Sequence, residues 1–163
     1  MNALVLYDTK FGNTERIAET IALAFQEAVP TRLTAIEDVT DLAAELDGVD
    51  ILVVGGPTQI HGISGGLRHM IESLGEGSLK GIRTAAFDTR LHGMKLVTGS
   101  AAVRLGRLLR RRGAWLVVPP TSFIVEGREG PLQPGEVEHA QAWAVEVLNA
   151  VGIRVPEHAH SRV

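Results

Sequence analysis

Two kinds of hydrophobic pattern alternate along the chain. Short runs of consecutive aliphatic residues, such as Val49 to Val54, alternate with segments in which apolar residues recur every three or four positions, such as Ile17, Ile21 and Phe25. The first pattern is typical of buried β-strands and the second of amphipathic helices. Strands are expected at residues 2–7, 31–36, 49–54, 82–87, 115–118 and 122–125, and helices from residue 14 onward and at 41–46, 67–74, 100–112 and 135–150.

This order of elements predicts the α/β fold class. Strands that alternate with helices form a parallel sheet through right-handed crossovers, with helices packed on both faces. An aliphatic run without alternation, like the one at residues 49–54, suits a strand that is covered on both faces. The chain has the length of about one average domain. We place that domain at residues 1–152, followed by a C-terminal tail at residues 153–163.

Candidate binding residues are expected in the loops that follow the predicted strands. Open parallel sheets bind ligands beyond the carboxyl ends of their strands, at the point where the strand order reverses. The loops at this edge are residues 8–13, 55–66 and 88–99, and all three are rich in glycine, threonine and other loop-forming residues.

The first of these loops has the features of an anion site. It leads into the amino end of a helix, where unpaired backbone N–H groups and the helix dipole attract negative charge. Gly12 lets the backbone approach a ligand closely, and Thr9, Asn13 and Thr14 offer side-chain donors. A phosphate fits these features. The alternative is that Asn13 or Thr14 only caps the helix.

Two motifs carry a resemblance to a known family. Residues 7–15, with the sequence YDTKFGNTE, resemble the FMN phosphate loop of the flavodoxin family. Residues 55–58 (GGPT), which follow the third predicted strand, resemble the start of that family's first ring-binding loop. The likeness covers about residues 1–150 and implies FMN as the cofactor. It also implies a flavodoxin-like three-layer sandwich whose five parallel strands have the order 2-1-3-4-5.

The resemblance further implies two sets of cofactor-binding residues. The phosphate would be bound by Thr9, Lys10, Phe11, Gly12, Asn13 and Thr14. The ring would lie between the later loops, at Pro57, Thr58, Gln59, Ile60, His61 and Gly62 and at Asp88, Thr89, Arg90, Leu91 and His92. These ring loops depart from the family pattern because they contain no Trp or Tyr. Positive charge from His61, Arg90 and His92 would favour an anionic reduced flavin and raise its reduction potential.

Composition and charge limit the kinds of chemistry that this protein can perform. The chain has no cysteine, so disulfides, a thiolate nucleophile and iron–sulfur ligation are excluded and redox work needs a bound cofactor. Its apolar runs are far shorter than the ~20 residues that span a bilayer, and the N-terminus lacks signal-peptide features, so we expect a cytoplasmic protein. Residues 1–60 carry 3 basic and 10 acidic side chains, whereas residues 61–112 carry 10 basic and 3 acidic ones. This uneven distribution of charge either steers a charged partner toward the protein or reflects solvated helix faces that differ in sign.

Other interpretations use the same segments. Residues 62–66 match G-x-S-x-G, and Ser64, Asp88 and His92 follow the chain order of an α/β-hydrolase triad, but Ser64 does not directly follow a strand. A phosphoacceptor receiver domain needs Asp at the end of its third strand, where this chain has Gly55. Glycine motifs of nucleotide-binding loops do not occur. Two histidines near the C-terminus, at positions 158 and 160, lack a third metal ligand, and we expect no metal site.

We therefore expect an electron-transfer protein that carries electrons through bound FMN. Its partners would be a reductase and an acceptor protein that dock transiently at the flavin edge, without nucleic acid or membrane contacts. Two alternatives stay open: an FMN-dependent NAD(P)H:quinone-type reductase, and a flavin-less binding module of the same fold. The segment Pro120–Pro131 indicates a hairpin-like insertion that covers the sheet edge.

Overall fold

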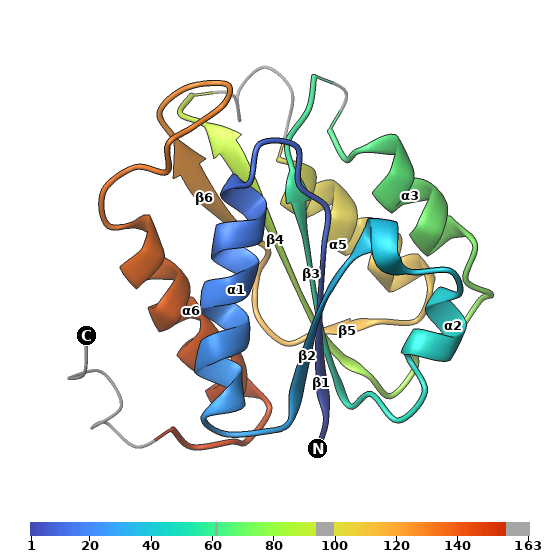
Figure 1. The fold of residues 1–163 in the computed structure, drawn as a ribbon. Helices are drawn as coiled ribbons and strands as arrows, with labels where there is room; N and C mark the ends of the chain where they lie inside the picture. The colour runs from blue at the N-terminus through green and yellow to red at the C-terminus, as the bar shows by residue number, and fades with distance from the viewer. Residues whose placement is uncertain (61, 94–99, 156–163) are drawn as a thin grey trace.

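The computed structural model of the chain describes residues 1–60, 62–93 and 100–155, and within them six strands form one sheet (Figure 1). The elements in chain order are β1 (Ala3–Tyr7), α1 (Asn13–Gln26), β2 (Thr31–Ala35), the 3-10 helix η1 (Ile36–Asp38), α2 (Leu42–Glu45), β3 (Ile51–Pro57), α3 (Gly65–Glu72), β4 (Arg83–Leu91), α5 (Ala101–Arg111), β5 (Trp115–Leu116), β6 (Thr121–Val125) and α6 (Glu136–Ala150). In these described ranges no helix is both long enough and apolar enough to cross a bilayer.

The sheet has the order β2-β1-β3-β4-β5, and every strand pair is parallel, which confirms the predicted order. The fifth position, however, is shared by two strands. The short β5 pairs with Arg83 and Thr84 at the start of β4, and β6 pairs with residues 87–91 at its end. Pro119 and Pro120 separate the two strands because proline cannot donate to a strand ladder. The strand predicted at residues 122–125 is confirmed as β6, and the segment after it turns back on Val125 through an antiparallel bridge to Leu132.

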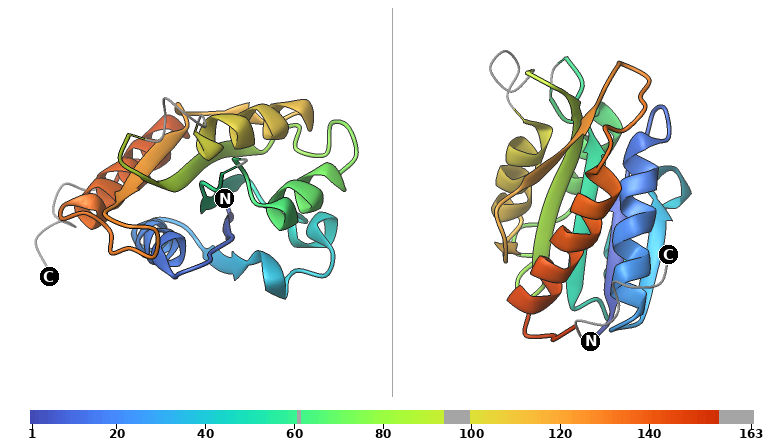
Figure 2. Two further views of the ribbon diagram at one scale, coloured as in Figure 1. Left: turned by 90° about the horizontal axis from the view of Figure 1, so that it is seen from above. Right: turned by 90° about the vertical axis from the view of Figure 1, so that its left-hand side faces the viewer.

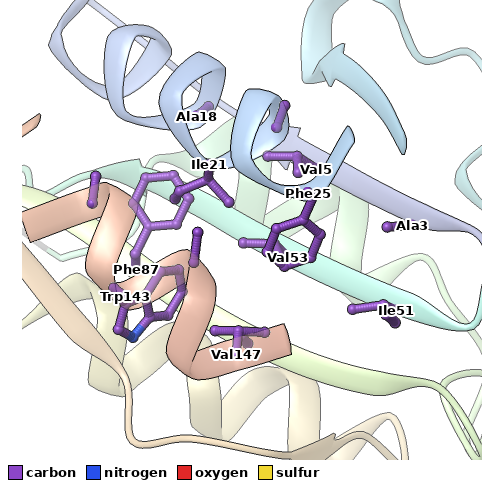
Figure 3. Close-up of a cluster of buried hydrophobic side chains, with 14 of the residues drawn as sticks. Ala3, Val5, Ala18, Ile21, Phe25, Ile51, Val53, Phe87, Trp143 and Val147 are labelled. Atoms are coloured by element: carbon purple, nitrogen blue, oxygen red, sulfur yellow. The ribbon is translucent and has the colours of Figure 1, made fainter. Parts of the chain in front are cut away.

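Helices cover both faces of the sheet in three layers, as predicted (Figure 2). Alternate strand residues enter two separate cores because successive side chains point to opposite faces. Val5 and Val53 pack under α1 and α6, in the cluster drawn in Figure 3, whereas Leu6 and Val54 pack under α2, α3 and α5. Full burial of β1 and β3 on both faces explains their unbroken aliphatic runs.

An aromatic cluster holds the centre of the first core. The Phe87 ring makes edge-to-face contacts with Phe123 and Trp143, at centroid distances of 5.8 and 6.0 Å. The same ring covers Gly55, where an added Cβ would lie 2.0 Å from the ring. Only glycine therefore fits at this position.

Residues 55–57 continue β3, although the sequence predicted that they would end it.

Strand β4 also extends beyond its predicted end at residue 87. Residues 88–91 were expected in a loop, but they pair with β6, and Thr89 also pairs with Pro57 of β3. At the other end of the chain, Ile153 and Val155, which follow the predicted boundary at 152, pack against the first core. Most of the predicted tail, including both C-terminal histidines, lies outside the described residues.

Candidate functional site

A pocket of about 440 Å³ lies at the edge of the sheet where the parallel strands end, within the usual size range for small-molecule sites. Figure 1 shows the carboxyl ends of β1, β3, β4 and β6 together at this edge. The pocket is lined by Thr9, Lys10, Phe11, Asn13 and Thr14 from the first loop and α1, by Pro57, Thr58, Gln59 and Ile60 after β3, by Thr89, Arg90 and Leu91 of β4, and by Val125 and Arg128.

The three predicted segments thus meet at one pocket, and most of the predicted site residues line it. Gly12, Gly62, Asp88 and His92 do not line it, and His61 lies outside the described residues. The assignment of the lining residues as cofactor contacts stays a prediction. Sequence reasoning missed Val125 and Arg128 because the pairing of β6 with β4 brings them to the pocket, and no local motif marks that pairing.

One end of the pocket is formed by the start of α1. Gly12 occupies the N-cap position with φ 87°, and no side chain caps the helix. Asn13 instead donates from Nδ2 to the Glu129 carbonyl oxygen at 3.1 Å, and the Thr14 hydroxyl bonds to the Thr89 hydroxyl at 2.8 Å. The alternative that Asn13 or Thr14 only caps the helix is therefore wrong. The amino end of α1 keeps backbone N–H groups for an anion.

The charged residues in the pocket lining are all positive. Lys10, Arg90 and Arg128 line the pocket, and no carboxylate does so among the described residues. Within the described part of the chain, the Arg90 Nε atom is buried without a hydrogen-bond partner, and Nη1 donates to the Leu91 carbonyl oxygen at 3.4 Å. Because a buried donor without an acceptor is costly, Arg90 fits a site whose ligand supplies one.

Asp88 is fully buried behind the pocket, where it positions other residues. Its Oδ2 atom accepts hydrogen bonds from the Thr58 hydroxyl at 2.7 Å, the Ser100 hydroxyl at 2.8 Å and the Ala102 backbone N–H at 3.0 Å. The Thr58 hydroxyl oxygen in turn accepts from the Ala101 N–H at 3.2 Å. This one carboxylate therefore joins the segment after β3 and the start of α5 to β4, and it also caps α5.

The residues of the possible hydrolase triad have other roles. Ser64 caps α3 by accepting from the Leu67 N–H at 3.3 Å, and the bonded oxygen of Asp88 serves the network around Thr58 and Ser100. His92 is exposed in the turn after β4. This arrangement lacks the hydrogen-bonded chain that a nucleophilic serine needs.

Within the described residues no cluster of three or more His, Cys, Asp or Glu side chains offers a metal site.

Tyr7, at the end of β1 beside the first loop, is held in its neutral form. Its hydroxyl donates to Glu15 Oε1 at 3.0 Å. Burial raises the pKa of Tyr7 to about 12, and the hydrogen bond and negative charge of Glu15 act in the same direction. This hydrogen bond connects the first turn of α1 to the end of β1.

No known protein-family profile matches the chain. Several solved structures are similar to it. Oxidised flavodoxin 1 from Bacillus cereus superposes with a TM-score of 0.75 at 21% identity, over 91% of this chain and 98% of that one. A WrbA-like flavodoxin from Agrobacterium tumefaciens gives 0.70 at 22% identity, over 93% and 98%. The rubredoxin oxygen:oxidoreductase of Desulfovibrio gigas gives 0.71 at 19% identity, over 93% of this chain and 36% of that protein. The fold is therefore flavodoxin-like.

Removal of the Asp88 carboxylate is expected to destabilise the protein. Asp88→Ala leaves the buried Ser100 hydroxyl, the half-buried Thr58 hydroxyl and the Ala102 N–H without this acceptor, and we expect the free energy of unfolding to fall by about 3 kcal/mol. Asp88→Asn keeps an acceptor oxygen and should lose less. Asp41→Ala, which removes an exposed cap from α2, serves as the control and should lose about 1 kcal/mol. Urea unfolding followed by circular dichroism measures all three, and an equal loss in Asp88→Ala and Asp41→Ala would contradict the assigned role.

Tyr7 is expected to titrate late in the folded protein. Because it is the only tyrosine, the near-UV absorbance of tyrosinate reports on it alone. We expect a midpoint near pH 12 when folded and near 10 when unfolded in urea. The folded pKa is the higher one, so the stability contribution is complete below pH 10 and decreases as the pH rises from 10 toward 12. Glu15→Gln should lower the pH midpoint of the Tyr7 titration in the folded protein. A midpoint of 10 in the folded wild type would refute the interaction between Tyr7 and Glu15.

Proposed function

We propose that this protein binds FMN and carries electrons between redox partner proteins. The observation that supports the proposal is a single pocket that joins the uncapped amino end of α1 to three positive side chains on a flavodoxin-like fold. The phosphate would lie at the start of α1, and the ring between the ends of β3 and β4.

The donors at the start of α1 suit a phosphate. Lys10 supplies a positive charge, Thr9 and Asn13 supply polar side chains, and the helix supplies backbone N–H groups. A phosphate monoester carries about −1.5 to −2 charges at neutral pH and accepts hydrogen bonds through three terminal oxygens. No carboxylate that would repel the phosphate lines the pocket in residues 1–60, 62–93 and 100–155.

The other end of the pocket suits a planar aromatic ring. Phe11 and Ile60 line the pocket and are 42% and 74% exposed, and Pro57 and Leu91 add further apolar surface. A ring that covers these side chains would remove apolar surface from water. The segment that carries Ile60 is held by two backbone hydrogen bonds between Gln59 and Gly62, both 2.9 Å long. The ring would therefore lie beside a segment in which Gln59 and Gly62 are joined by hydrogen bonds.

Bound FMN would supply the reversible uptake and release of electrons. The residues of this chain bind its phosphate, flank its ring and set the electrostatic environment. Of the three positive residues expected beside the ring, Arg90 is the one that lines the pocket among the described residues. Its guanidinium would favour negative charge on the reduced ring and so raise the reduction potential. Exposure of Phe11 and Ile60 at the pocket supports a ring edge that a partner protein reaches by transient docking.

Retention of the cofactor tests this proposal directly. The purified protein is mixed with FMN, free ligand is removed by gel filtration, and the visible spectrum is recorded. We expect a retained flavin band with shifted peaks and quenched FMN fluorescence at micromolar protein. Reduction in two separate one-electron steps would support a carrier, whereas a single two-electron step would favour the quinone-type reductase. No retained flavin and no quenching would overturn the proposal in favour of a flavin-less binding module.

Substitution of Gly12 tests the position of the phosphate. Gly12→Val places a branched side chain at φ 87° beside the expected phosphate, and we expect FMN affinity to fall by about 100-fold or more. Gly81→Val is the matched control, because Gly81 has φ 86° in the turn before β4 and open space around it. Both variants carry similar backbone strain, so only Gly12→Val should lose FMN. A folded Gly12→Val protein with unchanged affinity in a fluorescence titration would refute the placement.

A further inference from the structure

The chain between β6 and α6 forms a compact turn at the ligand edge of the sheet, residues 126–131, which we call the 126–131 turn. The Glu126 N–H donates to the Pro131 carbonyl oxygen at 2.8 Å and the Gln133 N–H donates to the Ile124 carbonyl oxygen at 2.9 Å. An antiparallel bridge between Val125 and Leu132 closes its base. In Figure 1 the turn is the orange loop above β6, at the same edge as the start of α1.

This turn rests directly on the start of α1. The Asn13 side chain donates from Nδ2 to the Glu129 carbonyl oxygen at 3.1 Å. Gly130 packs against the same carboxamide so closely that an added Cβ would lie 2.6 Å from the Asn13 Oδ1 atom. The two segments are 116 positions apart in sequence, and their contact sets where the 126–131 turn presents its side chains.

The turn brings the positive charge of Arg128 to the pocket. Arg128 lines it together with Lys10, Asn13 and Thr14. Two acidic residues, Glu126 and Glu129, lie near Arg128 in sequence, yet the ion pairs found across the described residues do not include Arg128. Among the described residues, the exposed guanidinium of Arg128 is therefore not held by a carboxylate of this chain.

We propose that Arg128 is a second phosphate-binding cation, delivered by the 126–131 turn, and that it makes the site select phosphorylated flavin over riboflavin. The inference rests on the proposed function, because it concerns the same pocket. Lys10 supplies one charge to the phosphate, and the α1 amino end supplies N–H groups. A monoester near −2 has charge and oxygen lone pairs left for a further cation. A guanidinium meets that need with paired N–H donors, which makes it a better phosphate ligand than a point charge.

Fluorescence titrations with FMN and with riboflavin test this inference. The variants are Arg128→Gln, Arg128→Lys and the control Arg154→Gln, whose arginine is exposed beyond the C-terminal end of α6. We expect Arg128→Gln to weaken FMN about tenfold or more and to leave riboflavin binding unchanged. Arg128→Lys should recover part of the loss, and Arg154→Gln should match the wild type.

Two further measurements keep the test decisive. Raising NaCl from about 50 to about 200 mM should weaken FMN binding less in Arg128→Gln than in the wild type, because one phosphate contact is already missing. Gly130→Ala keeps Arg128 but displaces the turn from Asn13, and it should reproduce the loss of FMN affinity. Unchanged FMN affinity in Arg128→Gln, or an equal loss for FMN and riboflavin, would overturn the inference. A wild-type protein that does not bind FMN would instead overturn the proposed function.

Discussion

One buried carboxylate determines how the ligand edge of this protein is assembled. Burial of a carboxylate is costly unless hydrogen bonds replace its lost hydration; the Oδ2 atom of Asp88 receives three, whereas its Oδ1 atom is buried without a partner among the described residues. The three donors come from the segment after β3 and from the first residues of α5. The bonds therefore set the position of Thr58, which lines the pocket, relative to Thr89 and Arg90, the residues that follow Asp88 along β4. Asp88 shapes the pocket without facing it.

The second constraint is the length of β4, which runs from residue 83 to residue 91, whereas β1 covers only residues 3–7. The added residues pair with β6, so β6 reaches the ligand edge and the 126–131 turn can contact Asn13 at the start of α1. The pocket is consequently enclosed by segments from both halves of the chain, and its positive charges come from three of them, at Lys10, Arg90 and Arg128. The flavodoxin-like fold thus presents a pocket whose charged lining residues, among the described ones, are all positive.

The sequence predicted the elements whose signals are local. Among the described residues, hydrophobic periodicity located α2, α3, α5, α6 and the start of α1 to within a few residues, but it did not indicate η1. The glycine and threonine pattern of residues 8–14 predicted an anion site at the start of α1, where the pocket lies. The strand ends at Gly55 and Asp88 were mispredicted because glycine and aspartate normally end strands. Here the Phe87 ring occupies the space that a side chain at residue 55 would need, and three hydrogen bonds hold the Oδ2 atom of Asp88 inside the protein.

By itself, the sequence determined the α/β class, the strand order through its resemblance to a family, and the three segments that meet at the pocket. Tertiary structure alone decided which residues of those segments face the pocket: it turned Asp88 behind the sheet edge and brought Val125 and Arg128 to the pocket. The physical reason is the range of the interactions. Periodicity and capping act over a few residues, whereas the pairing of β6 with β4 and the contact of Gly130 with Asn13 join positions far apart in the chain.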